Sequence, residues 1–320
     1  MSVLRRGRRL IGVLLLVGAL GYLFVHRLGW TELMTTLRAF DPSFGAAIVV
    51  AQFAFHFLGA VALWVLTLGA APRARFSSLT KAYWRGLAVG YWTPAGVGEA
   101  SFAWFMRRGG VPVHEGLAIL TVDKLVTLAV TALAASPALL LAASTASVEW
   151  RRLSPATVLA VALALIVVAA LAIVLREVSW VSRLRWAVLA YLRAVRAVAA
   201  RSYLFLAANF AVTIARTLAA AAAFWWAVSS FGGPLEIPFL DFFVRVSAAR
   251  LLALVLPAPN GLGVFEVTLV ELMGAGAVPA AAVFSGAILA RLVALVIVSV
   301  GFFVHPARES TDRLKSGEVG

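Results

Sequence analysis

Residues 94–99 read Pro94-Ala95-Gly96-Val97-Gly98-Glu99, and residues 259–266 read Pro259-Asn260-Gly261-Leu262-Gly263-Val264-Phe265-Glu266. Each stretch interrupts an apolar region that is long enough to enter a membrane, Leu79 to Arg108 and Phe239 to Gly276. Eight residues separate the first Pro from an Arg, Arg85 or Arg250, and twelve separate the Glu from a second Pro, Pro112 or Pro279. After eleven more residues comes a basic residue, Lys124 or Arg291. The matching spacings indicate an internal repeat with units 79–126 and 239–304.

The composition is that of a polytopic membrane protein. Of the 320 residues, 62% are apolar and 13% are charged, with a mean hydropathy of +0.97, whereas soluble domains are about 45–50% apolar and about 25% charged. Apolar segments of the length that crosses a bilayer are Leu10 to Val25, Phe44 to Leu68, Gly116 to Ala143, Pro155 to Leu175, Tyr203 to Phe231 and Ala280 to Val304. We predict an all-α protein with one integral membrane domain over residues 1–320 and about six full spans.

The distribution of charge and the absence of Cys exclude several classes of protein. The net charge is +14, but the basic residues cluster beside apolar segments, where they are typical of topology signals and contacts to anionic lipids at the cytoplasmic face. We therefore expect no nucleic-acid partner. With no Cys and four His, we also expect no metal site and no cofactor. Segment 176–201 alternates six Arg with large apolar residues, as an interfacial amphipathic helix does.

The basic residues also predict how the two interrupted regions enter the membrane. If each region is a re-entrant pair of half-helices, the basic N-terminus, segment 176–201 and the C-terminal tail all lie in the cytoplasm, as the positive-inside rule requires. A full crossing by Leu79 to Arg108 places the six-Arg segment outside instead. Three spans separate the two regions, so they enter from opposite faces. The repeat is then inverted, as in many secondary transporters, and both termini are cytoplasmic.

Ionisable residues at membrane depth are the candidate site residues, because a charge there is costly unless it is paired or hydrated. The Pro/Gly loops reach the bilayer midplane, where irregular backbone must be buried in protein or line a cavity. We predict a central cavity whose substrate-binding residues are Arg85, Glu99, Lys124, Arg216, Arg250, Glu266 and Arg291. The loop residues of this cavity are Pro94, Gly96, Gly98, Pro259, Asn260, Gly261 and Gly263.

The cations of this predicted cavity suit an anion, since Arg binds phosphate through two hydrogen bonds and helix N-termini attract anions. The two Glu residues could orient the arginines, bind an ammonium group or carry a proton. The alternative is that these charges form internal ion pairs that hold the helices in register. Asp241 and Arg245, spaced i and i+4, are suited to such a pair.

Enzyme signatures are poor. The sequence has no nucleophile elbow, phosphate-binding P-loop, zinc-protease or kinase motif. Neither loop contains a Ser or His nucleophile, and the nearest Ser residues are Ser101 and Ser247. His56 stands alone in an apolar segment and is expected to be a core residue. We predict that the protein is not an enzyme, with an intramembrane enzyme acting on lipid phosphates and a membrane scaffold as the alternatives.

The run from Arg85 to Lys124, together with Leu256 to Glu266 and Arg291, resembles the lysylphosphatidylglycerol synthase transmembrane (flippase-like) family. The resemblance covers about residues 10–305, and Asp123-Lys124 departs from the Arg-Asp type of pair that members often carry. The resemblance implies a protein of the cell (inner or plasma) membrane. In fused bacterial enzymes of the family this region moves an aminoacylated phospholipid between leaflets, whereas this chain is expected to lack the cytosolic aminoacyl-transferase domain.

From these observations together we expect a lipid flippase or transporter. It moves an anionic or zwitterionic head group, of a membrane phospholipid or another lipid phosphate, through the central cavity. The acyl chains stay in the bilayer.

Overall fold

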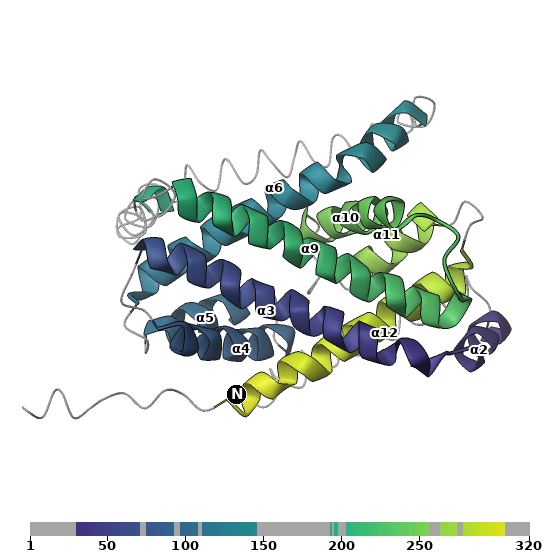
Figure 1. Cartoon of the computed structure of the whole chain (residues 1–320), viewed down its shortest axis with the longest axis horizontal. Coiled ribbons are helices and arrows are strands. Elements are labelled where there is room, and N and C mark those ends of the chain that lie inside the picture. Colours follow the sequence, from purple (N-terminus) through teal and green to yellow (C-terminus); the bar gives the residue numbers. More distant parts are fainter. Residues whose placement is uncertain are drawn as a thin grey trace, which may run out of the picture. The chain divides into compact units, whose positions relative to one another are not determined.

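The computed structural model of the protein describes residues 30–70, 75–92, 97–107, 111–145, 193, 195–197, 203–255, 263–273 and 278–304. Within these ranges every regular element is a helix and no strand occurs. The α-helices are α2 (Trp30–Arg38), α3 (Gly45–Ala70), α4 (Phe76–Trp92), α5 (Val97–Arg107), α6 (Val113–Thr145), α9 (Tyr203–Gly232), α10 (Phe239–Val255), α11 (Val264–Met273) and α12 (Ala280–Ser299), with short 3-10 helices η1 (Pro42–Phe44) and η6 (Val300–Phe302) (Figure 1). The all-α prediction is confirmed.

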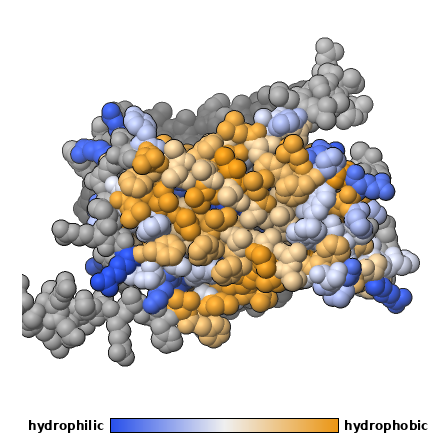
Figure 2. Space-filling model, in the orientation of Figure 1, coloured by the Kyte–Doolittle hydropathy of each residue, from blue (hydrophilic) through white to orange (hydrophobic). Residues whose placement is uncertain are grey.

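Four helices in the described part of the chain are long and apolar enough to cross a membrane: Pro42–Gly69, Val113–Ala138, Tyr203–Phe231 and Ala280–Phe302. They coincide with four of the predicted spans. Apolar side chains such as Val50, Leu133 and Val296 are exposed on them, and Figure 2 shows apolar residues at the surface. A surface of this kind is stable against lipid, which is itself apolar.

Two predicted spans, Leu10 to Val25 and Pro155 to Leu175, lie outside the described residues. Segment 176–201 also lies outside them, apart from residues 193 and 195–197. Val195 packs against a hydrophobic core that includes Leu63, Phe102 and Ile119.

The two interrupted regions each form a pair of short helices. α4 and α5 flank residues 93–96 and pack against each other, and α10 and α11 likewise flank residues 256–263. With 11 and 10 residues, α5 and α11 are each about 15–17 Å long at 1.5 Å per residue, roughly half of a bilayer core of about 30 Å. A long apolar helix, α6 or α12, follows each pair.

The described chain divides into two compact units. Unit 1 comprises residues up to Leu58 and Ile214–Val300, and unit 2 comprises Gly59–Thr213 and the residues from Gly301 onward. The boundaries fall inside α3 and α9, which are each one unbroken helix (Figure 1). Unit 1 therefore holds α2, α10, α11 and α12 with parts of α3 and α9, and unit 2 holds α4, α5 and α6 with the remaining parts.

Each unit has its own hydrophobic core, in which glycines allow helices to approach closely. In unit 1, a Cβ added to Gly286 of α12 would lie 2.6 Å from Cα of Val228 in α9. In unit 2, a Cβ on Gly86 of α4 would lie 2.6 Å from Cβ of Phe102 in α5. Small residues serve this purpose in membrane helices, because packing replaces the hydrophobic effect as the force between them.

A backbone hydrogen bond connects the segment that precedes α3 to the end of α9. The backbone N–H of Asp41 donates to the carbonyl of Ser230 at 2.7 Å, while the Asp41 carboxylate accepts from the N–H of Ser43 at 2.9 Å and caps η1. The hydrogen bond from the Ser43 backbone lowers the pKa of Asp41 below its usual value, because it favours the ionised form.

Candidate functional site

Two of the predicted arginines converge on one aromatic ring in unit 1. Arg216 of α9 and Arg250 of α10 each place the guanidinium carbon 5.1 Å from the ring centroid of Phe55 in α3, a distance at which a cation is attracted to a ring. The neighbouring His56 is 1% exposed and its ring lies 4.8 Å from that of Phe55. His56 is thus buried, as expected. Because both guanidinium carbons lie 5.1 Å from the same ring centroid, the two cations are at most about 10 Å apart.

The same contact recurs at the other predicted arginines. Arg85 of α4 lies over Phe105 of α5 at 5.1 Å in unit 2, and Arg291 of α12 lies over Phe265 of α11 at 5.3 Å in unit 1. A guanidinium group stacked on a ring is oriented by it while the N–H groups at its edge remain able to donate hydrogen bonds. Sequence reasoning selected the arginines but missed their aromatic partners, whose identity no spacing rule predicts.

Glu266 in the first turn of α11 connects the end of the second Pro/Gly loop, at Gly263, to α12. This side chain is 2% exposed and forms an ion pair with Arg291, while its Oε2 accepts the backbone N–H of Gly263 at 2.8 Å. Gly263 has φ +81°, which Gly adopts without steric cost. Because Gly263 precedes α11 and Glu266 is its third residue, the contact is the returning half of a capping box.

Glu266 is therefore paired with an arginine in this structure, and each of its three possible roles in function stays a prediction. The pair also links α11 to α12, as the ion-pair alternative expects.

Unit 2 contains a buried polar network that sequence reasoning did not select. The side-chain N–H groups of Asn209 in α9 donate to the carbonyl of Ala62 in α3 at 3.0 Å and to Oδ1 of Asp123 in α6 at 3.2 Å. Asn209 and Asp123 are 0% and 5% exposed. The sequence signal was a single Asn inside an apolar span. The next residue, Lys124, is exposed in unit 2.

Several predicted site residues cannot be placed in this way. Gly98 belongs to the first turn of α5. The side chain of Glu99 lies outside the described part of the structure, as do residues 94, 96 and 259–261.

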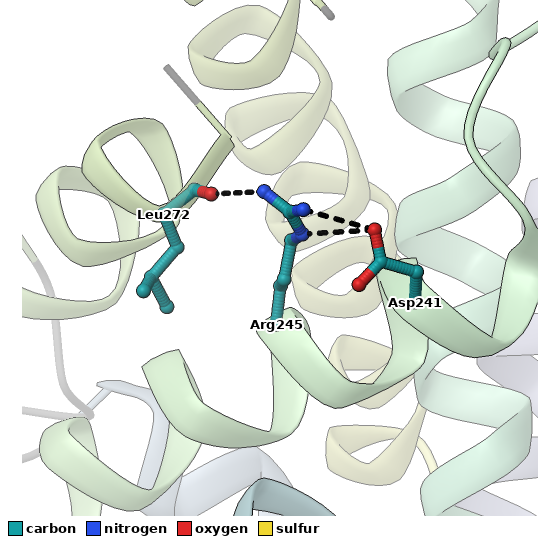
Figure 3. A network of polar contacts seen from close by, with 3 residues as sticks. All are labelled: Asp241, Arg245 and Leu272. Carbon is teal, nitrogen blue, oxygen red and sulfur yellow. Dashed lines mark hydrogen bonds and ion pairs between the residues drawn. The ribbon is translucent and has the colours of Figure 1, made fainter. Parts of the chain in front are cut away.

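The predicted pair of Asp241 and Arg245 is confirmed. Arg245 contacts Oδ2 of Asp241 through Nε at 3.2 Å and through Nη2 at 2.9 Å. Its Nη1 donates a further hydrogen bond to the carbonyl of Leu272 in α11 (Figure 3). Arg245 therefore also joins α10 to α11, which the i and i+4 spacing did not predict.

The match to a known family covers nearly the whole chain. A family model described as the lysylphosphatidylglycerol synthase TM region matches residues 9–301. The chain belongs to this family. The predicted resemblance to the lysylphosphatidylglycerol synthase transmembrane family is thereby confirmed.

Membership of the lysylphosphatidylglycerol synthase transmembrane family and the four apolar helices identify a multi-pass membrane protein with a lipid-related function. No single curated protein gives a significant match to the chain. Among the described residues of this family member, no group of three or more His, Asp or Glu side chains could hold a metal ion.

Proposed function

We propose that this protein is a lipid flippase that moves an anionic or zwitterionic phospholipid head group across the membrane through a polar cavity, without chemical change to the lipid. The observation that carries the proposal is the convergence of Arg216 and Arg250 on Phe55 inside apolar helices. Charges at such a depth are costly and mark substrate pathways in membrane proteins.

The chemistry of the stacked arginines supports a phosphate as the recognised group. Guanidinium N–H groups match the spacing of phosphate oxygens and bind them in pairs, as an ammonium group cannot. The binding residues we propose are Arg85, Glu99, Lys124, Arg216, Arg250, Glu266 and Arg291. The apolar outer surface of the helices allows the acyl chains to remain in the bilayer while the head group crosses.

For the membrane topology we propose six spans and two re-entrant helix pairs in an inverted repeat, in the cell membrane, with both termini in the cytoplasm. The short pairs α4–α5 and α10–α11, each followed by a long apolar helix, support this arrangement.

Single-Cys labelling tests this topology, and the absence of native Cys makes the labelling unambiguous. With an impermeant thiol reagent, Cys at Gly110 is expected to react from the cytoplasm and Cys at Gly233 from outside. Cys at Ser78 and Cys at Gly110 are expected to react from the same side, since a re-entrant pair begins and ends there. Reaction of these two from opposite sides contradicts the re-entrant arrangement.

Leaflet exchange in proteoliposomes tests the function. The purified protein is expected to accelerate the exchange of labelled phospholipids between leaflets relative to protein-free liposomes, and the lipid is expected to be recovered chemically unchanged. Conversion of a labelled lipid phosphate to a new product would favour the intramembrane enzyme. A stably folded protein that produces neither exchange nor product would favour the scaffold.

A further inference from the structure

The short helix α11 is held at both of its ends by charged side chains of other helices. At its start, Glu266 pairs with Arg291 of α12. At its end, the carbonyl of Leu272, next to the last residue of the helix, accepts a hydrogen bond from Arg245 of α10 (Figure 3). The last carbonyls of a helix have no partner within the helix, and a cation near them also complements the helix dipole. Arg245 therefore supplies what this helix end lacks.

The position of α11 depends on these polar contacts more than it would in water. A helix of ten residues is too short to be stable alone. Its apolar side chains Phe265, Leu269 and Met273 are packed in the core of unit 1, but lipid is about as apolar as a protein core, so the hydrophobic effect does not hold these side chains in place. The charged contacts at the two ends therefore act together with side-chain packing to fix its position.

These two contacts differ in burial. The side chain of Arg245 is 27% exposed and Leu272 is partly buried, whereas the side chains of Arg291 and Glu266 are 20% and 2% exposed. A hydrogen bond or ion pair of a charged group is weaker where water can reach it than where water is excluded. The end of α11 at Leu272 is therefore held less tightly than the end at Glu266.

We propose that Arg245 is a latch and that α11 is a gate, which opens at its Leu272 end when this hydrogen bond is released. Asp241 keeps the guanidinium group aimed at the carbonyl. Opening uncovers part of α10, the helix that carries Arg250 about a turn and a half beyond Arg245. The role of the gate in admitting lipid to Arg250 rests on the flippase function proposed above.

The latch occurs in only one of the two repeated regions. Counted back from Arg250, Asp241 and Arg245 are nine and five residues away, and the corresponding residues before Arg85 are Phe76 and Thr80. Neither can form a charged pair. The gate thus controls access from one side of the membrane, which under the proposed topology is the outer side.

Hydrogen exchange of the full-length protein in lipid nanodiscs tests the latch independently of transport. Arg245→Met keeps the apolar stem of the side chain and removes the hydrogen bond. The amides of α11 are expected to exchange about ten- to a hundredfold faster, the change that accompanies loss of one hydrogen bond to a charged group. The amides of α12 are expected to keep their wild-type rates.

The matched control is Arg107→Met, which removes an arginine that lies over Trp104 in α5 of unit 2 and leaves α11 unchanged. Unchanged exchange in α11 of Arg245→Met overturns the proposal. So does an equal increase in α11 and α12, since this means general destabilisation.

A cleavable cross-link tests the gate. In the chain without native Cys, Arg245→Cys with Leu272→Cys is joined by a bis-maleimide that contains a disulfide. Lipid exchange is expected to stop after cross-linking and to return when the linker is reduced. Exchange that continues in the cross-linked protein overturns the gate. A wild-type protein that never exchanges lipid refutes the flippase function instead, and the hydrogen-exchange result then still decides whether the latch exists.

Discussion

Arg250→Ala is expected to lower the affinity for a lipid phosphate, and with it leaflet exchange at subsaturating lipid, about ten- to a hundredfold. The physical reason is that a hydrogen bond to a charged group contributes about 1.5–3 kcal/mol, which corresponds to this change in binding constant. Arg216→Ala and Arg85→Ala are expected to behave in the same way. Arg250→Lys retains the charge but loses the paired N–H geometry, so we expect an intermediate loss.

The stacking contact can be tested separately. Phe55→Leu removes the ring that Arg216 and Arg250 share and is expected to reduce exchange several-fold, in line with about 0.5–2 kcal/mol for a cation–π contact. Phe57→Leu is the matched control, because Phe57 lies on the same helix and is 40% exposed. The measurements are the exchange of labelled phospholipids in proteoliposomes and the melting temperature with and without added lipid.

A different set of results contradicts the phosphate site. Wild-type exchange in Arg85→Ala, Arg216→Ala and Arg250→Ala would exclude these arginines as the phosphate site. A lower melting temperature that added lipid does not raise would identify the arginines as structural. Arg107→Ala again serves as the control cation, since it is not among the proposed binding residues.

Glu266→Gln is expected to destabilise the protein by about 3–5 kcal/mol, the effect of removing one partner of a buried ion pair. The Gln side chain keeps an oxygen that can accept the N–H of Gly263, so the substitution removes the charge opposite Arg291 and little else. Thermal unfolding followed by the fluorescence of the ten Trp residues measures the effect. Glu236→Gln, at an exposed acid in the same unit, is expected to cause no loss.

A double variant separates the structural role of this pair from its function. Replacing both partners, as Glu266→Met with Arg291→Met, leaves no uncompensated buried charge and is expected to recover most of the stability. Lipid exchange is expected to remain impaired, because the Arg291 cation is absent. Recovery of exchange together with stability would show that the pair only holds α11 and α12 in register.

The features that the sequence predicted correctly are those that depend on one helix and its solvent. The spans beginning at Phe44, Gly116, Tyr203 and Ala280 follow from apolar length, because a helix satisfies its backbone hydrogen bonds within itself, as a bilayer requires. The short helices follow from Pro, which removes a helical hydrogen bond, and from Gly, which destabilises a helix through its conformational entropy. The pair of Asp241 and Arg245 lies within one helix turn, where the 3.6-residue period alone brings the two side chains together.

The partners that join different helices were decided only by the tertiary structure. Neither the shared ring of Phe55 beneath Arg216 and Arg250 nor the burial of Asp123 against Asn209 was predicted. Arg245 donates a hydrogen bond to the carbonyl of Leu272, which is 27 residues away in the sequence. Glu266 forms its ion pair with Arg291, a partner that the sequence did not identify. Sequence periodicity defines which residues share a helix face, but the rotation of that face and the neighbour it meets result from the packing of all the helices together.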